Sequence, residues 1–216
     1  MSDDAPLTGG RLRAGISNAM TRMMGEFYGK GSERAKTYIF GDYVFVVLED
    51  VLTTAEKTLK QEGDLDLIRK VRLTFEDLMT QAFVGAVEQL TRRRVVAYHS
   101  QVVFDPDVAF EFFVLEPDDG VASGEDGVDD SAALGPGEAG DADRLPSSAR
   151  PGGGGSESSA GSGATRAAIS NAIVRLLREH HGKGPSTTRT FFADDYVFCI
   201  AEEPLTTVER LSLIHI

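Results

Sequence analysis

RAGISNAMTRMMGEFYGKGSERAKTYIFGDYVFVVLEDVLTTAEK, residues 13–57, decides the fold because the chain carries this run twice. RAAISNAIVRLLREHHGKGPSTTRTFFADDYVFCIAEEPLTTVER, residues 166–210, aligns with it without a gap. Of the 45 aligned positions 21 are identical, and ISNA, GKG, DYVF and LTT recur as blocks. Identity at this level indicates a duplicated domain.

The repeated run predicts a helix followed by a β-hairpin and a short second helix. Apolar residues at positions 16, 19, 20, 23, 24 and 27 form one stripe of an amphipathic helix, and Gly29 follows where a left-handed cap ends such a helix. TYIF and YVFVVLE flank the turn residues Gly41 and Asp42, which is typical of a hairpin whose second strand is central. Thr53 ahead of Glu56 predicts a capping box.

A long helix and a second hairpin complete the first copy. The helix is predicted from Asp64 to Arg92, and two strands follow, with a turn at 105–107. We expect Phe75 on the helix and Phe110 on the last strand to join the two layers in the core. The expected apolar stripe of the helix consists of Ile68, Val71, Phe75, Leu78, Ala82, Ala86 and Leu90. The fold class is therefore α+β, a two-layer domain of order α-β-β-α-α-β-β with a mostly antiparallel four-stranded sheet, followed by a partial second copy.

Composition divides the chain into segments. Residues 118–163 contain 10 acidic and 2 basic side chains, a net of -8 out of -12 for the whole chain, and almost no large apolar residue. Such a stretch buries too little surface to fold, so we predict a disordered linker at 118–163. The first domain is predicted at 13–117 after a disordered N-terminus at 1–12, and the truncated second domain at 164–210.

The last six residues, 211–216, are expected not to be natural. LSLIHI shares no residue with TLKQEG, which stands at the equivalent place in the first copy, although nearly half of the preceding positions are identical. LSLIHI is also one reading frame of CTGTCTCTTATACACATC, a transposon-end adaptor of sequencing libraries. We therefore expect the gene to continue past Arg210 into a complete second domain.

The acidic balance also limits the function. A net charge of -12 argues against nucleic-acid binding. The longest apolar run, Tyr43 to Leu48, is far shorter than the roughly 20 residues that span a bilayer, and no signal peptide is visible. A single cysteine and four histidines, of which only His180 and His181 are neighbours, predict neither a disulfide framework nor a metal site, and no cofactor is expected. The sequence therefore predicts a soluble cytoplasmic protein.

The run ISNAMTRMMGEFYGKGSERAKTYIFGDYVFVVLEDVLTTAEKTL, with the later VVAYHSQVVFDPDVAFEFFVLEP, resembles the MpsC-type domain. This bacterial domain is named for its association with a sodium-translocating, membrane-potential-generating system. The resemblance covers nearly all of residues 13–117 and restarts at Arg166. It implies a partner in a membrane ion-transport complex, and it supplies no catalytic residue to carry over.

Five residues are candidates for binding: Ser17, Asn18, Lys30, Asp42 and Arg93. Ser17 and Asn18 lie on the polar part of the first helix, where local hydrogen bonding is the commoner role. Lys30 lies in a GKG loop that follows a helix, so the nearby helix end repels anions, and a cap with a turn is favoured over a phosphate site. Asp42 and Arg93 are the other charged candidates.

Two classes of function remain open. The favoured one is a non-enzymatic accessory or regulatory module that acts through protein binding, twice on a tether, which suits avidity. The alternative is a small-ligand or anion-binding domain, or a cryptic enzyme, in which the GKG loop, Asp42 and Arg92–Arg94 surround one pocket. A flat apolar face favours the first class, and a convergent pocket of these groups favours the second. The sequence does not determine the oligomeric state.

Overall fold

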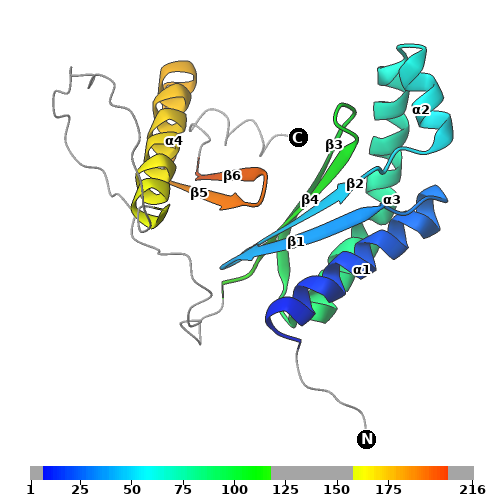
Figure 1. Cartoon of the computed structure of the whole chain (residues 1–216), viewed down its shortest axis with the longest axis horizontal. Coiled ribbons are helices and arrows are strands. Elements are labelled where there is room, and N and C mark those ends of the chain that lie inside the picture. The colour runs from blue at the N-terminus through cyan, green and yellow to red at the C-terminus, as the bar shows by residue number, and fades with distance from the viewer. Residues whose placement is uncertain (1–6, 118–157, 204–216) are drawn as a thin grey trace, which may run out of the picture. The chain divides into compact units, whose positions relative to one another are not determined.

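A computed structural model describes residues 7–117 and 158–203 of the chain, and these residues belong to two units (Figure 1). The predicted linker and the last six residues lie largely or wholly outside the described residues. The first unit consists of α1 (Gly9–Tyr28), β1 (Arg34–Phe40), β2 (Tyr43–Glu49), α2 (Thr54–Gln61), α3 (Leu65–Thr91), β3 (Val95–Val103) and β4 (Val108–Leu115). The second consists of α4 (Ser158–His181), β5 (Thr187–Ala193) and β6 (Tyr196–Glu202). The predicted α+β class and the order of elements are confirmed.

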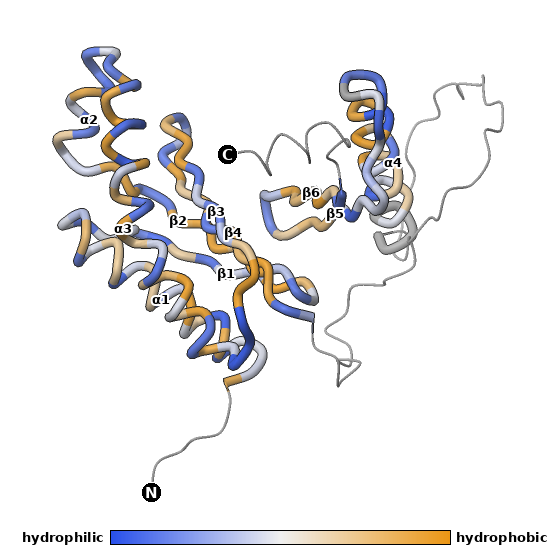
Figure 2. Tube along the Cα trace, turned by 180° about the vertical axis from the view of Figure 1, so that it is seen from behind, coloured by the Kyte–Doolittle hydropathy of each residue, from blue (hydrophilic) through white to orange (hydrophobic). Residues whose placement is uncertain are grey.

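The sheet of the first unit has four antiparallel strands in the order β1-β2-β4-β3. Each hairpin contributes one edge strand and one central strand, and the β2–β4 ladder joins the two hairpins. The apolar run of β2 predicted this central position. In Figure 2 the hydrophobic residues of this sheet are concentrated on the central strands β2 and β4.

Helices α1 and α3 cover one face of this sheet (Figure 1). Alternate residues of β2 and β4 point toward the helices, because side chains of a strand alternate between its two faces. The buried core between the layers consists of Ile16, Met20, Met23, Met24, Val44, Val46, Leu48, Val51, Met79, Phe83, Val87, Ala109, Phe113 and Leu115.

The GKG loop ends α1 as predicted. Gly29 has a φ of 73°, and its N–H donates to the carbonyl oxygen of Gly25 at 3.0 Å. Such a left-handed cap favours glycine, which has no Cβ. Gly31 is needed for space, because a Cβ there would lie 3.0 Å from the carbonyl oxygen of Thr21.

The predicted starts of α2 and α3 are confirmed. The Thr53 hydroxyl accepts from the Glu56 N–H at 3.2 Å, and the Glu56 carboxylate accepts from the Thr53 N–H at 2.8 Å. The carboxylate of Asp64 caps α3 by accepting from the Leu67 N–H at 3.2 Å. Arg92 ends α3 in the left-handed conformation, with a φ of 58°.

The predicted apolar stripe of α3 is correct for Ile68, Phe75, Ala82, Ala86 and Leu90, which are buried or pack against the core, and wrong for Val71 and Leu78. The side chains of Leu78 and Val71 are 65% and 39% exposed. The most buried residues of the helix are Ile68, Arg72, Met79, Phe83 and Val87, so the centre of the buried face is offset from the predicted stripe. Arg72 can occupy the buried face because the carboxylate of Glu56 on α2 neutralises its charge. A charged residue in the sequence of this helix therefore does not indicate a solvent-exposed position.

The last strand also presents a different face from the expected one. Ala109, Phe113 and Leu115 point into the core, whereas Phe110 is half-buried on the opposite face. Both faces of β4 are apolar, so alternation alone does not select one. Phe75 does pack against the core, with its ring 5.0 Å from that of Tyr28. The expected core pair is therefore correct for Phe75 and wrong for Phe110.

Two predicted boundaries need correction, because helices extend into segments that were expected to be disordered. Helix α1 begins at Gly9 within the predicted 1–12 segment, and Leu12 packs against the core. Helix α4 begins at Ser158 within the predicted 118–163 linker. Once a stable stripe has nucleated a helix, each further residue adds one hydrogen bond, so the helix propagates past the repeated run.

The second unit repeats the local structure of the first. The hydroxyls of Ser170 and Thr190 lie 2.8 Å apart, as those of Ser17 and Thr37 do. Gly182, like Gly29, caps its helix with a φ of 72°. Within the described part of this unit, no second helix covers the face of the hairpin that packs on α4. As a result, Val197 is 51% exposed, whereas the equivalent Val44 is fully buried.

Candidate functional site

Lys30, the basic residue of the GKG loop, is held at one end of β2. Its Nζ donates to the carbonyl oxygen of Asp50 at 2.7 Å, to the Asp50 carboxylate at 2.8 Å and to the carbonyl oxygen of Leu52 at 3.0 Å. Lys57 donates to the other carboxylate oxygen of Asp50 at 2.5 Å. Hydrogen bonds from Lys30 and Lys57 hold the pKa of Asp50 well below its usual range. The lysine therefore has a structural role, tying the helix cap to the strand end.

Asp42 and Arg93 meet at the other end of β2. The Arg93 Nη2 donates to the Asp42 Oδ1 at 2.5 Å and to the carbonyl oxygen of Glu116 at 2.5 Å. The 7 residues of β2 separate this cluster from Lys30, a span of roughly 23 Å at about 3.3 Å per residue. The structure thus brings Asp42 and Arg93 together but does not bring them to the GKG loop.

Ser17 and Asn18 point in different directions. Ser17 is buried, and its hydroxyl hydrogen-bonds that of Thr37 at 2.8 Å, so it joins α1 to β1. Asn18 is exposed on α1. The five predicted residues therefore lie at several separate places and form no common site.

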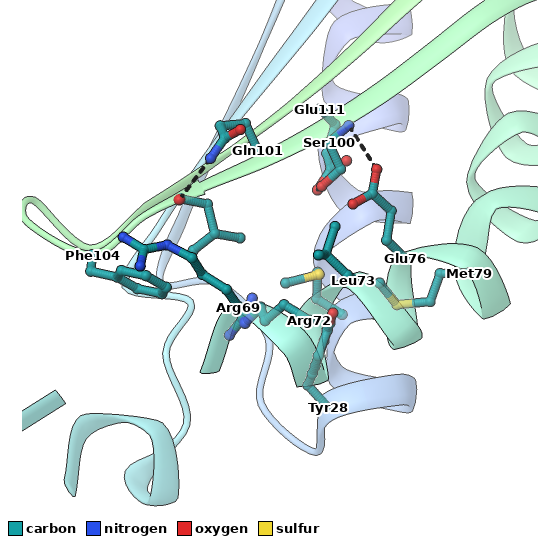
Figure 3. Close-up of a pocket in the computed structure, with 12 residues that line it drawn as sticks. Tyr28, Arg69, Arg72, Leu73, Glu76, Met79, Ser100, Gln101, Phe104 and Glu111 are labelled. Carbon is teal, nitrogen blue, oxygen red and sulfur yellow. Dashed lines mark hydrogen bonds between the residues drawn. The ribbon is translucent and has the colours of Figure 1, made fainter. Parts of the chain in front are cut away.

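A cavity lies instead between α3, the end of α1 and the helix-facing side of β3 and β4 (Figure 3). Its volume is about 220 Å³. The walls are mainly apolar, with four charged side chains among the lining residues. The lining consists of Met24, Tyr28, Arg69, Arg72, Leu73, Glu76, Met79, Ser100, Gln101, Val102, Phe104 and Glu111.

Glu111 is the deepest charged group of the cavity, with only 2% of its surface exposed. Its carboxyl oxygens accept from the Tyr98 hydroxyl at 2.7 Å and lie 3.2 Å from the Ser100 hydroxyl. Burial, reinforced by the nearby charge of Glu76, raises the pKa of Glu111 to about 8. The carboxyl group is therefore mainly protonated at neutral pH, and burial and Glu111 together raise the pKa of Tyr98 as well.

Glu76 approaches the same point from α3. Its carboxylate accepts from the Ser100 N–H at 3.3 Å, so one residue of β3 contacts both carboxyl groups (Figure 3). Two carboxyl groups close to each other in an apolar setting are typical of binding or proton-transfer sites.

Arg72 closes the cavity on the side of α2. Its Nε and Nη2 donate to the two carboxylate oxygens of Glu56, both at 2.7 Å, and Nη2 also donates to the carbonyl oxygen of Val51 at 3.0 Å. Its guanidinium lies over the ring of Tyr28, 4.4 Å from the centroid. Burial alone would raise the pKa of Glu56, but hydrogen bonds from Arg72 and Thr53 outweigh it and lower that pKa. The pair is a bidentate buried ion pair that positions α2 on α3.

Sequence reasoning missed this cavity because its polar groups come from distant parts of the chain. Two local signals were present. Glu111 is the single charged residue in the strand VAFEFFVL, and Arg72 interrupts the apolar face of a helix. A charge at a buried position of an otherwise apolar element indicates a paired or functional group.

The opposite face of the sheet carries aromatic side chains. Tyr38, Phe45, Phe112 and His99 lie in one row across the four strands. The rings of Phe45 and Phe112 stack with centroids 4.8 Å apart, and Tyr43 stacks on Phe112 at 6.2 Å. This set of residues on β1, β2 and β4, here called the outer aromatic face, consists of Tyr38, Tyr43, Phe45, Val47, Phe110 and Phe112.

The second copy keeps the hairpin part of this face. Phe191, Tyr196, Phe198 and Ile200 stand where the first copy has Tyr38, Tyr43, Phe45 and Val47. Phe191 pairs with Phe198 on the side of the hairpin opposite the Ser170–Thr190 contact. On the helix-facing side, Val46 and Leu48 are replaced by the smaller Cys199 and Ala201. Between the two copies, the outward-facing residues of the hairpin therefore stay large and apolar, whereas two of its helix-facing residues become smaller.

The described residues form a two-layer α+β domain, followed in the sequence by a partial second copy. The domain has a small, mainly apolar cavity and an aromatic sheet face. No helix among the described residues is long and apolar enough to cross a membrane, and these residues contain no cluster of metal-binding side chains. The family described as "Na+-translocating membrane potential-generating system (MpsC)" matches residues 8–117 and 162–213. The chain belongs to this family, and the two matched segments agree with a partial second copy. No curated protein and no solved structure matches the chain significantly.

Proposed function

We propose that the chain is a non-enzymatic accessory module that binds a protein partner through the outer aromatic face. The observation that carries this proposal is the repetition of that face in both copies, where Tyr43 and Phe45 recur as Tyr196 and Phe198. Neither α1 nor α3 covers this face, and Tyr43, Phe45 and Phe112 are only half-buried on it, although Val47 beside them is buried. Aromatic side chains are enriched at the centres of protein interfaces.

The family description supports the kind of partner. It refers to a sodium-translocating system that generates a membrane potential. The proposed partner is therefore a membrane subunit of such an ion-transport complex, bound from the cytoplasmic side. Two copies of one face on a single chain would raise the overall affinity for a dimeric or repeated target, because the second contact is intramolecular.

Site-specific photocrosslinking tests the proposal. Phe112→p-benzoylphenylalanine places the crosslinker on the outer aromatic face, and Leu78→p-benzoylphenylalanine places it on the exposed side of α3 as a matched control. With the full chain in cells of the source organism, we expect the position-112 variant to capture subunits of an ion-transport complex and the position-78 variant to capture none. Equal capture from both positions, or only soluble proteins from position 112, would contradict the proposal.

The alternative of an anion pocket at the GKG loop has less support. Lys30 already donates to three oxygen atoms of the chain, and Arg93 donates to Asp42 and Glu116 at the far end of β2. These groups do not converge, so they do not build one binding site.

A further inference from the structure

The charged groups around the cavity are unequally paired. Both arginines have acidic partners: Arg72 binds both carboxylate oxygens of Glu56, and Arg69 donates to Asp66 at 2.8 Å. The described partners of Glu76 and Glu111 are neutral, namely the Ser100 N–H, the Ser100 hydroxyl and the Tyr98 hydroxyl. Among the described residues, no basic side chain hydrogen-bonds the carboxyl group of Glu76 or Glu111, although the charge of Arg72 acts on Glu111 from nearby.

We propose that this cavity binds a small organic ammonium ion, with its charged head between Glu76 and Glu111. Its hydrocarbon part would lie against Met24, Leu73, Met79 and Phe104, which line the same space (Figure 3). The volume of about 220 Å³ is below the roughly 300–1,000 Å³ of cavities for drug-sized ligands. The ligand is therefore a small monoamine and not a nucleotide or a lipid.

The walls of the cavity favour an organic cation over an anion or a metal ion. An anion would need a free guanidinium, and both arginines are already paired with carboxylates. A hard metal cation prefers six or more oxygen ligands, whereas thioether, aliphatic and aromatic groups form most of this cavity. A carboxyl group at one side and apolar groups at the other match the two ends of an amine.

The raised pKa of Glu111 leads to a measurable effect of ligand binding. Burial and the charge of Glu76 raise its pKa to about 8. An ammonium ion beside Glu111 would stabilise the carboxylate and lower this pKa, since an opposite charge within about 4–6 Å favours ionisation. Binding is therefore expected to release a proton at neutral pH.

Isothermal titration of the full chain with phenethylammonium chloride at pH 8 tests this proposal. 2-Phenylethanol has the same hydrocarbon body without the charge and serves as the ligand control. We expect saturable binding of the ammonium ion at one site and at least tenfold weaker binding of the alcohol. No saturable binding of phenethylammonium, or equal binding of the alcohol, would overturn the proposal. Competition by NaCl beyond that of equal KCl would indicate a sodium site and would also overturn it.

Matched variants locate the site. Glu76→Gln and Glu111→Gln each remove one carboxylate, and Glu62→Gln on the exposed end of α2 is the control. We expect at least a tenfold loss of affinity for Glu76→Gln and Glu111→Gln and none for Glu62→Gln. Glu76→Gln affects a partly exposed helix residue, so it keeps the test valid if Glu111→Gln fails to fold. Unchanged affinity in Glu76→Gln would show that the ligand binds elsewhere.

Discussion

At the residue scale, Lys30 gives the clearest prediction, because its ammonium group joins three oxygen acceptors of two strand-end residues. The sequence favoured a helix cap with a turn at the GKG loop and gave Lys30 no partner. In the structure its side chain is 30% exposed and fully hydrogen-bonded. We expect Lys30→Ala to lower the free energy of unfolding by about 1–3 kcal/mol, since hydrogen bonds of charged groups lie in this range.

Urea denaturation of the full chain measures this effect. Lys70→Ala, on the exposed side of α3, is the matched control and should stay within about 0.5 kcal/mol of the wild type. Equal midpoints for the two variants would show that Lys30 contributes nothing to the connection between α1 and β2.

Glu111 gives a prediction about pH. The carboxyl group ionises near its ordinary pKa of 4.5 in the unfolded chain and near 8 in the folded chain. Between these values the folded state holds the extra proton, so a rise in pH favours unfolding, by at most about 1.4 kcal/mol per unit. We expect the stability of the wild type relative to Glu111→Gln to fall from pH 5 to pH 8 and then to level off.

Thermal unfolding of both proteins across this pH range measures the difference. Groups other than Glu111 titrate equally in the two proteins, so their effects cancel in the comparison. Parallel curves for the two proteins would mean that Glu111 is ionised in the folded state at neutral pH.

At the scale of elements, the orientation of α3 leads to a contrast between two large side chains. Phe83 is fully buried between α3 and the sheet, whereas Leu78 is 65% exposed. We expect Phe83→Ala to cost about 3–5 kcal/mol, because it removes a buried ring and leaves a cavity. Leu78→Ala should cost less than about 0.5 kcal/mol. Chemical denaturation of both variants measures these losses in the free energy of unfolding. A larger loss for Leu78→Ala than for Phe83→Ala would mean that Leu78 is buried, as the sequence predicted.

The elements themselves could be predicted because their signals are local. The cap at Gly29, the capping box of Thr53 and Glu56 and the turn at Gly41 each depend on a few neighbouring residues. Which face of a helix or strand is buried could not be predicted in the same way. Arg72 is buried only because Glu56, 16 residues earlier, pairs with it, and periodicity contains no information on such a pair.

The candidate site could be predicted least. Lys30 and Arg93 were candidates for binding, but the structure uses them to join strand ends. The cavity groups Glu76, Ser100 and Glu111 come from a helix and two strands and meet only through the tertiary fold. A strand with two apolar faces, as in β4, leaves its buried side undetermined until the helices are placed.

At the scale of the whole molecule, the separation into two units predicts the pattern of limited proteolysis. The acidic, glycine-rich composition of residues 118–163 favours cleavage there before cleavage in α3, whose backbone is hydrogen-bonded throughout. We expect brief trypsin treatment to cut after Arg144, which precedes Leu145, and to leave a stable fragment that contains residues 7–117. Mass spectrometry identifies the first products, and initial cuts at Arg69 or Lys70 would contradict the assignment of the first unit.

The sheet order β1-β2-β4-β3 has a consequence for how the first unit holds together. Each half of this unit is a helix followed by a hairpin, and the two halves meet through the β2–β4 ladder and the packing of α1 on α3. The domain is thus built like a fused dimer, with the short connection at Glu62–Asp64 keeping the halves at a high effective concentration. If the chain were cut at Gly63, folding would become a bimolecular association, and the stability of this domain would depend on its concentration.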